Sequence, residues 1–125
     1  LKDDVLYKRI KHVMTESART HQFKYALENR DPLMLGMCLN ASHQSLKEDY
    51  EVTGIHLDTI VSAAQQYAVG ARMTGAGFGG CAVALVNTRD VPLMMDEVYE
   101  TYMEKTSITP TFYQVIPSDG VRKDE

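Results

Sequence analysis

Residues 70–81 have the sequence Gly70-Ala71-Arg72-Met73-Thr74-Gly75-Ala76-Gly77-Phe78-Gly79-Gly80-Cys81. Four of the six residues at 75–80 are glycine. The segments on either side, at 69–74 and 81–86, have the length and composition of short strands, and the second, an uninterrupted apolar run, is typical of a fully buried strand. The pattern therefore predicts two strands joined by a glycine loop.

The glycine loop has two interpretations. Glycine adopts positive φ angles easily and lets backbone N–H groups approach a bound group, which is how chains build concavities for anionic oxygens. Glycine clusters also form tight turns and bulges that bind nothing. The spacing alone leaves a phosphate-side role and a structural turn open.

Three common nucleotide-binding motifs do not account for the loop. The spacing Gly75-x-Gly77-x-x-Gly80 matches the dinucleotide fingerprint, but that motif requires a helix directly after the loop, where a strand is predicted. A protein-kinase loop requires a lysine on the next strand and HRD and DFG elements, which do not occur. A Walker loop requires Gly-Lys-Ser or Gly-Lys-Thr, and neither is present.

Three segments before the loop have the apolar spacing of helices. The first covers 4–28, as one long helix or two short ones. The second begins at Asp31-Pro32, because Asp caps free N–H groups and Pro suits the first turn. The third follows the break at Gly54 and is expected to end near Tyr67.

The residues after the loop predict one more helix and one more strand. Asp90, with Pro92 in the first turn, begins the helix. The strand is predicted at 112–116, stopped by Pro117 and the turn at 118–120. The whole pattern predicts an α+β fold in which helices pack on a small antiparallel sheet, as a single domain over 1–125.

Composition excludes several classes of partner. The chain has 125 residues, of which 44% are hydrophobic and 24% charged, enough for one core without disulfides or metal. Its longest apolar run, 81–86, is far shorter than the roughly 18 residues that a membrane span needs. Thirteen basic and seventeen acidic residues supply no basic field for phosphate backbones. We therefore predict no membrane and no nucleic acid as a partner.

Candidate ligands and nucleophiles outside the loop are isolated. Cys38 and Cys81 are expected to be small buried hydrophobes, and two unpaired thiols indicate a reducing, cytoplasmic location. The four histidines lack the i, i+4 pairing of a helical zinc site, so no metal is predicted: His12, His21, His43 and His56. The polar run at 40–50 has two interpretations, helix capping with a hydrated face or a binding site.

The chain begins at Leu1 without a signal or transit pattern, so we expect an excised part of a longer protein.

The stretch 70–81 closely resembles the third signature motif of galactokinases, members of the GHMP superfamily of small-molecule kinases. The run 40–53, followed by Leu57-Asp58, resembles the helix and turn that precede this motif in galactokinases. Phe112-Tyr113 and the segment 118–120 resemble the family's closing strand and turn. The resemblance covers nearly the whole chain in the family's order, apart from a polar tail.

The resemblance implies that the chain is the C-terminal domain of a galactokinase, with the ferredoxin-like arrangement of GHMP kinase C-terminal domains. Galactokinases also carry an N-terminal Gly-Glu-His signature and a serine-rich phosphate loop, and neither occurs here. The family's catalytic aspartate and magnesium-linked serine belong to that absent N-terminal domain. We therefore expect the chain alone to contain no catalytic residue and no metal ligand, to hold neither ATP nor Mg²⁺, and to be inactive.

For the intact protein, the resemblance implies transfer of the γ-phosphoryl group of ATP, with Mg²⁺, to the anomeric hydroxyl of galactose. The loop would form a wall of N–H donors on the phosphate and substrate side of an interdomain cleft, from Gly75, Ala76, Gly77, Phe78, Gly79 and Gly80. Arg72 and Thr74 are candidate cleft residues. Arg72 either adds positive charge to the cleft or pairs with a structural carboxylate.

Other interpretations remain open. A kinase for another sugar, such as N-acetylgalactosamine, or a catalytically silent galactose sensor would share this domain. Outside the family, the pattern also suits a ferredoxin-like module that binds a small effector at the glycine loop. A domain separated from its partner would expose a semi-apolar face, and the fragment could self-associate through that face.

Overall fold

The computed structural model describes residues 2–78 and 80–116. The predicted α+β class is confirmed, since helices pack on a two-stranded antiparallel sheet. In chain order the elements are α1 (Lys2–Glu28), α2 (Pro32–Ser45), the π-helical turn η1 (Leu46–Tyr50), α3 (Gly54–Gln65), β1 (Gly70–Thr74), β2 (Cys81–Leu85), the 3-10 turn η2 (Thr88–Asp90) and α4 (Val91–Thr106).

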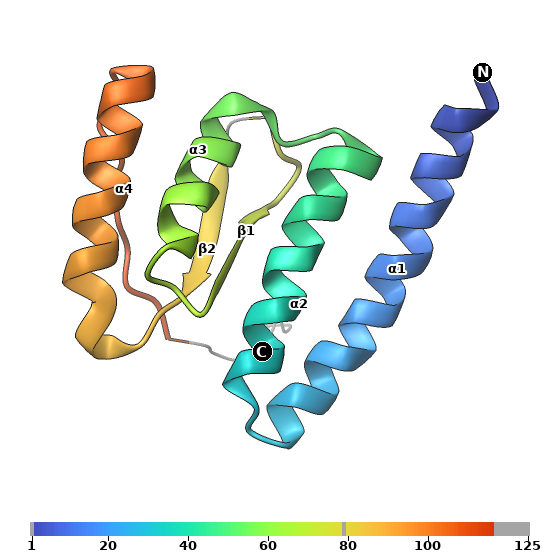
Figure 1. The fold of residues 1–125 in the computed structure, drawn as a ribbon, viewed down its shortest axis with the longest axis horizontal. Coiled ribbons are helices and arrows are strands. Elements are labelled where there is room, and N and C mark those ends of the chain that lie inside the picture. The colour runs from blue at the N-terminus through green and yellow to red at the C-terminus, as the bar shows by residue number, and fades with distance from the viewer. Residues whose placement is uncertain (1, 79, 117–125) are drawn as a thin grey trace, which may run out of the picture.

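The four α-helices lie side by side in one row across the molecule, and the β1–β2 hairpin lies among them. Figure 1 shows α4, α3, α2 and α1 in that order across the molecule, with β1 and β2 lying between α3 and α2. α3 packs against α4 and both strands, α2 packs against β1, and α1 contacts only α2 and η1 extensively. α1 therefore forms one end of the row, and α4 forms the other.

Local chemistry sets the start of α2 as predicted, whereas Asp90 precedes α4 without a side-chain capping bond. The Asp31 carboxylate accepts a hydrogen bond from the Met34 N–H at 3.1 Å, with Pro32 in the first turn of α2. α1 forms as one long helix rather than two. α3 ends at Gln65, slightly before the predicted end at Tyr67.

The core consists of two small clusters. The first lies between α3, α4 and β1 and contains Val61, Ala63, Ala64, Ala71 and Val98. The second contains Leu46, Leu57 and Met73, and it lies beneath the end of β1 that leads into the glycine loop. A fully buried side chain of this size stabilises the fold by about 1.5–3 kcal/mol. The second cluster therefore fixes the strand end that carries the loop.

Two predictions about strands are wrong. The segment 81–86 is not fully buried: β2 ends at Leu85, and its residues alternate between exposed and half-buried. β2 pairs only with β1 and is covered by α3 on one face, so among the described residues its other face stays open. The segment 112–116 forms no strand, because it joins no ladder; Phe112 packs against the first core cluster instead. The predicted turn at 118–120 lies outside the described residues.

The long helix α1 turns much of its apolar surface outward. Leu6, Ile10, Val13 and Met14 are each at least 49% exposed. The buried or half-buried side chains of this part of the helix are polar, among them His12, Glu16 and Arg19. No helix in the described part of the chain combines the length and hydropathy of a membrane span.

Candidate functional site

The glycine loop closes the β1–β2 hairpin with a backbone that only some residues tolerate. Gly75 and Gly77 have φ angles of 79° and 93°, and Phe78 has a φ of 58°. The residues from Thr74 to Ala76 are exposed, as are Gly80 and the Phe78 side chain, which is 76% exposed. Gly79 lies outside the described residues. Apart from half-buried Gly77, the described residues of the loop are thus exposed to solvent.

Gly77 is packed against the turn that follows η1. A Cβ atom at this position would lie 2.2 Å from the carbonyl oxygen of Val52. The N–H of Phe78 donates to the same oxygen at 2.8 Å. A Cβ on Gly75, in contrast, would meet no atom within 4 Å. Packing within this domain therefore requires glycine at position 77, whereas Gly75 faces open space.

α2 lies unusually close to β1. A Cβ on Gly36 would lie 2.0 Å from the Val69 carbonyl oxygen, and a Cβ on Gly70 would lie 2.6 Å from the Gly36 Cα. Only glycine at both positions permits this approach of two backbones. The approach brings the next two turns of α2 within hydrogen-bonding distance of the strand edge.

Two side chains of α2 bond to the free edge of β1. The Ala71 N–H donates to Asn40 Oδ1 at 3.0 Å, and the Met73 N–H donates to His43 Nδ1 at 3.1 Å. Residues three apart on a helix share a face, and alternate N–H groups of a strand point to the same side. The side chains of Asn40 and His43 therefore replace a neighbouring strand.

The carbonyl groups on the same edge also accept side-chain donors. Gln65 Nε2 donates to the Ala71 carbonyl at 3.3 Å and to Asn40 Oδ1 at 3.0 Å. Arg72 Nε donates to the Met73 carbonyl at 2.7 Å. An unpaired strand edge would be open to pairing with another chain, and these side chains block it.

His43 is buried, and its tautomer follows from its partners. A backbone N–H can only donate, so Nδ1 must be unprotonated; Nε2 then carries the hydrogen and donates to Asp58 Oδ1 at 3.0 Å. Burial lowers the pKa of His43 below its usual value, against the opposing hydrogen bond and charge of Asp58. The imidazole is therefore neutral near pH 7.

The polar run at 40–50 has one hydrated side, which includes Gln44, Lys47 and Glu48, and one buried side. Ser42, His43 and Ser45 are buried, because α1 covers one side of α2 and β1 the other. Ser42 Oγ donates to Glu16 Oε2 at 2.8 Å, and Ser45 Oγ bonds to His12 Nδ1 at 2.8 Å. A signal existed in the sequence, since the polar residues recur at three- and four-residue steps, as residues on a buried helix face do.

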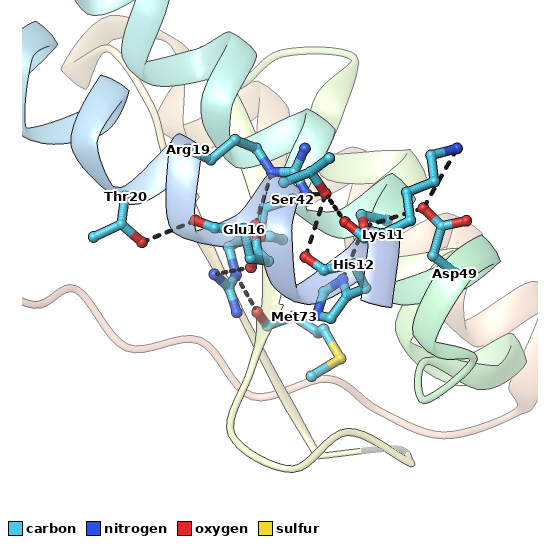
Figure 2. A network of polar contacts seen from close by, with 11 residues as sticks. Lys11, His12, Glu16, Arg19, Thr20, Ser42, Asp49 and Met73 are labelled. Atoms are coloured by element: carbon cyan, nitrogen blue, oxygen red, sulfur yellow. Dashed lines mark hydrogen bonds and ion pairs between the residues drawn. The ribbon is translucent and has the colours of Figure 1, made fainter. Parts of the chain in front are cut away.

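Arg72 belongs to a polar network around Glu16 of α1. Figure 2 shows Glu16 between Arg19 and Ser42, with Met73 nearby. Arg72 Nη1 lies 3.8 Å from Glu16 Oε2, and Arg19 Nε donates to Glu16 Oε1 at 2.7 Å. Burial raises the pKa of Glu16, but the bonds from Arg19 and Ser42 and the two guanidinium charges hold it below its usual value. The structure thus pairs Arg72 with a structural carboxylate.

The two cysteines differ. Cys38 is buried, and burial raises the pKa of its thiol. Cys81 is exposed, so the prediction that both are buried is wrong for Cys81, which stands at the loop end of the half-covered strand β2. Neither forms a disulfide. Within residues 2–78 and 80–116, no group of three or more His, Cys, Asp or Glu side chains is arranged to hold a metal ion.

Comparison with known proteins gives consistent relatives. A family model described as GHMP kinases C terminal matches residues 23–103. The chain is 50% identical over 122 residues to a galactokinase of Staphylococcus saprophyticus, covering 96% of this chain and 32% of that protein. It is 48% identical over 124 residues to a galactokinase of Staphylococcus carnosus, covering 98% and 32%. The chain spans about a third of the length of the curated relatives it matches.

Two solved structures are similar to different degrees. The galactokinase of Lactococcus lactis, complexed with galactose, superposes with a TM-score of 0.84 at 45% identity, over 87% of this chain and 29% of that one. The mevalonate kinase of L. major, in complex with R-mevalonate, gives a TM-score of 0.53 at 26% identity, over 82% and 33%. The likeness to the galactokinase is the stronger in both measures.

Proposed function

The chain belongs to the GHMP kinase family, whose C-terminal domain it contains, and from that premise we propose that it is the C-terminal part of a galactokinase. The intact enzyme transfers the γ-phosphoryl group of ATP to the anomeric hydroxyl of galactose and forms galactose 1-phosphate. The observation that carries this proposal is the identity of 50% to a galactokinase over 96% of the chain. The weaker likeness to a mevalonate kinase favours a sugar over mevalonate as substrate.

The glycine loop supplies backbone N–H donors on the phosphate and substrate side of a cleft between two domains. Phosphoryl transfer depends mainly on positioning and on neutralising the negative charge of the transferred group, which N–H dipoles can do. The N–H of Phe78 is excluded from this set because it donates to Val52. The donors are therefore those of Gly75, Ala76, Gly77, Gly79 and Gly80, with the exposed residue Thr74 at the entrance.

The remaining chemistry belongs to another domain of the intact protein. We assign Mg²⁺, which neutralises phosphate charge when bound, to that domain as well; among the described residues no three His, Cys, Asp or Glu side chains are grouped to hold a metal ion. The catalytic base and the ATP-phosphate loop are assigned to the same N-terminal domain. The relatives are about three times as long as this chain, which leaves room for such a domain.

The N-terminal domain packs against the outward apolar face of α1, which we define as Leu6, Ile10, Val13 and Met14. A helix that faces water normally presents polar residues on that side. These four side chains are exposed, while polar residues of the same helix face α2. Two thirds of the relatives' length lies outside this chain and is available to cover the face.

With two unpaired cysteines, the enzyme is expected in the cytoplasm.

The test is a sugar-kinase assay on the full-length gene product. Purified enzyme with ATP and Mg²⁺ is incubated with galactose, N-acetylgalactosamine or no sugar, and sugar phosphate is measured. Formation of galactose 1-phosphate, with residues 1–125 alone inactive, is expected. Phosphorylation of only N-acetylgalactosamine would replace the proposed substrate, and galactose binding without turnover would identify a sensor instead of an enzyme.

A further inference from the structure

The glycine loop is held at both ends by contacts from outside the hairpin. Its later part rests on Val52, through the N–H of Phe78 and the close approach of Gly77. Its earlier part follows Met73, whose N–H donates to His43 Nδ1 at 3.1 Å. Only Thr74 separates Met73 from Gly75, where the backbone turns to a φ of 79°. A shift of Met73 is therefore passed to the loop through one residue.

His43 connects three elements with one ring. It projects from α2, accepts from Met73 on β1 through Nδ1, and donates to Asp58 on α3 through Nε2 at 3.0 Å. His43 is 5% exposed and Met73 is 1% exposed, so water cannot readily replace either partner. Loss of the acceptor would leave a buried N–H unsatisfied, which costs more than the bond itself contributes.

We propose that His43 is a positioning residue for phosphoryl transfer, because its neutral imidazole holds the strand that aims the glycine loop. The inference rests on the proposed kinase function, but the contact itself can be tested without any assay of activity. The two ring nitrogens have separate tasks: Nδ1 positions β1, and Nε2 orients the ring from α3.

Protonation would disable this contact. A proton on Nδ1 would place two N–H donors against each other, and the bond to Met73 would be lost. The charged groups around the ring come from three elements: Asp58 on α3, which favours the protonated form, and Lys47 on η1 and Arg72 on β1, which oppose it. Burial also disfavours the protonated ring and lowers the pKa of His43. The contact therefore persists at neutral pH and is lost on acidification.

Two amide substitutions separate the two nitrogens. The Oδ1 atom of asparagine stands where Nδ1 of histidine stands, and Asn40 on the same helix face already accepts from a β1 N–H at 3.0 Å. His43→Asn therefore keeps the acceptor for Met73. The distal amide of glutamine stands nearer to Nε2, so His43→Gln keeps the contact to Asp58 and loses the one to Met73. His43→Leu removes both.

The first measurement is hydrogen–deuterium exchange of the segment 70–78 in the full-length enzyme. Exchange should be roughly tenfold faster in His43→Leu and in His43→Gln than in the wild type, because the Met73 N–H loses its acceptor. His43→Asn should stay within about threefold. His21→Asn, the same change at an exposed histidine on α1, is the matched control. If His43→Leu does not fold, the comparison of Gln with Asn decides.

The second measurement is steady-state kinetics with galactose and ATP. A misplaced loop should lower kcat on the order of tenfold to a hundredfold in His43→Gln and His43→Leu, while their KM for galactose changes little. The kcat of His43→Asn should stay near that of the wild type. Equal exchange in His43→Asn and His43→Gln would overturn the contact. Faster exchange with unchanged kcat would overturn the positioning role. A wild-type enzyme that phosphorylates no galactose would refute the proposed function, while the exchange result would still test the contact.

Discussion

The carbonyl oxygen of Val52 occupies the place that a side chain at Gly77 would need: a Cβ there would lie 2.2 Å from it. The two residues are far apart in sequence, and the N–H of Phe78 also donates to this oxygen. The turn after η1 therefore supports the outer end of the glycine loop. Gly75, with no atom within 4 Å of its missing Cβ, is free of that constraint.

Gly77→Ala should destabilise the domain more than Gly75→Ala. The Gly77 change combines a positive φ with overlap against backbone, on the order of 3 kcal/mol, whereas the Gly75 change involves only the φ strain, about 1 kcal/mol. Urea denaturation of the two variants measures the difference. Equal losses of stability would contradict the packing of Gly77 on Val52.

Gly75→Ala should affect turnover more than folding. Its added methyl group points into the open space where the proposed phosphate or sugar lies, and displacing a well-aimed donor costs on the order of a hundredfold in rate. The melting temperature and kcat of the full-length enzyme are measured in parallel. A lowered melting temperature with unchanged turnover of the folded protein would leave the loop as a structural turn.

The domain should lose stability in mild acid. Burial lowers the pKa of both His12 and His43 from the ordinary 6.5. The unfolded chain then binds protons that the folded chain does not, so stability is level above about pH 7 and falls as the pH drops below 6.5 toward the folded-state pKa values. The Glu16 pKa is lowered from 4.5, so this carboxyl adds its own loss of stability only as the pH falls below 4.5.

Urea midpoints at about pH 7.5 and about pH 5.5 measure this loss. Replacing both buried histidines, as His12→Asn with His43→Asn, should flatten the dependence. His21→Asn, at an exposed position, serves as the control and should leave it unchanged. An equally steep fall in the double variant would show that other groups carry the acid sensitivity.

The apolar face of α1 should associate when its proposed cover is absent. Residues 1–125 alone are expected to self-associate as the concentration rises, because Leu6, Ile10, Val13 and Met14 are exposed on one helix. Ile10→Glu with Met14→Glu should keep the fragment monomeric in sedimentation experiments, without unfolding it. Tyr7, which is also exposed, lies one turn before Ile10 on the same side of α1, so Tyr7→Glu should weaken the association as well.

In the full-length enzyme, the same Ile10→Glu and Met14→Glu pair should loosen the two domains and lower the temperature at which they unfold together. A fragment that stays monomeric at every concentration would argue against an exposed association face. A full-length enzyme with unchanged melting would argue against packing of the N-terminal domain on α1.

Much of the local structure could be predicted because it depends on neighbouring residues. Asp31 and Pro32 start α2 through a cap and a compatible φ, which need only the next turn of chain. Glycine at 75 and 77 predicts positive φ angles, and both residues have them. The resemblance of 70–81 to the galactokinase motif agrees with the family that matches the chain.

The sequence by itself therefore determined where the helices, the β1–β2 hairpin and its glycine loop lie and which family the chain belongs to, since periodicity, capping and motif spacing are local properties. It also predicted a strand at 112–116 that does not form, because a strand needs a distant partner to pair with. Only the tertiary structure decided what covers each face. It left β2 half-covered, turned Leu6, Ile10, Val13 and Met14 of α1 outward, and buried His43 between Met73 and Asp58. A pattern records which side chains share a face, but burial depends on distant segments that pack there, and no local spacing encodes them.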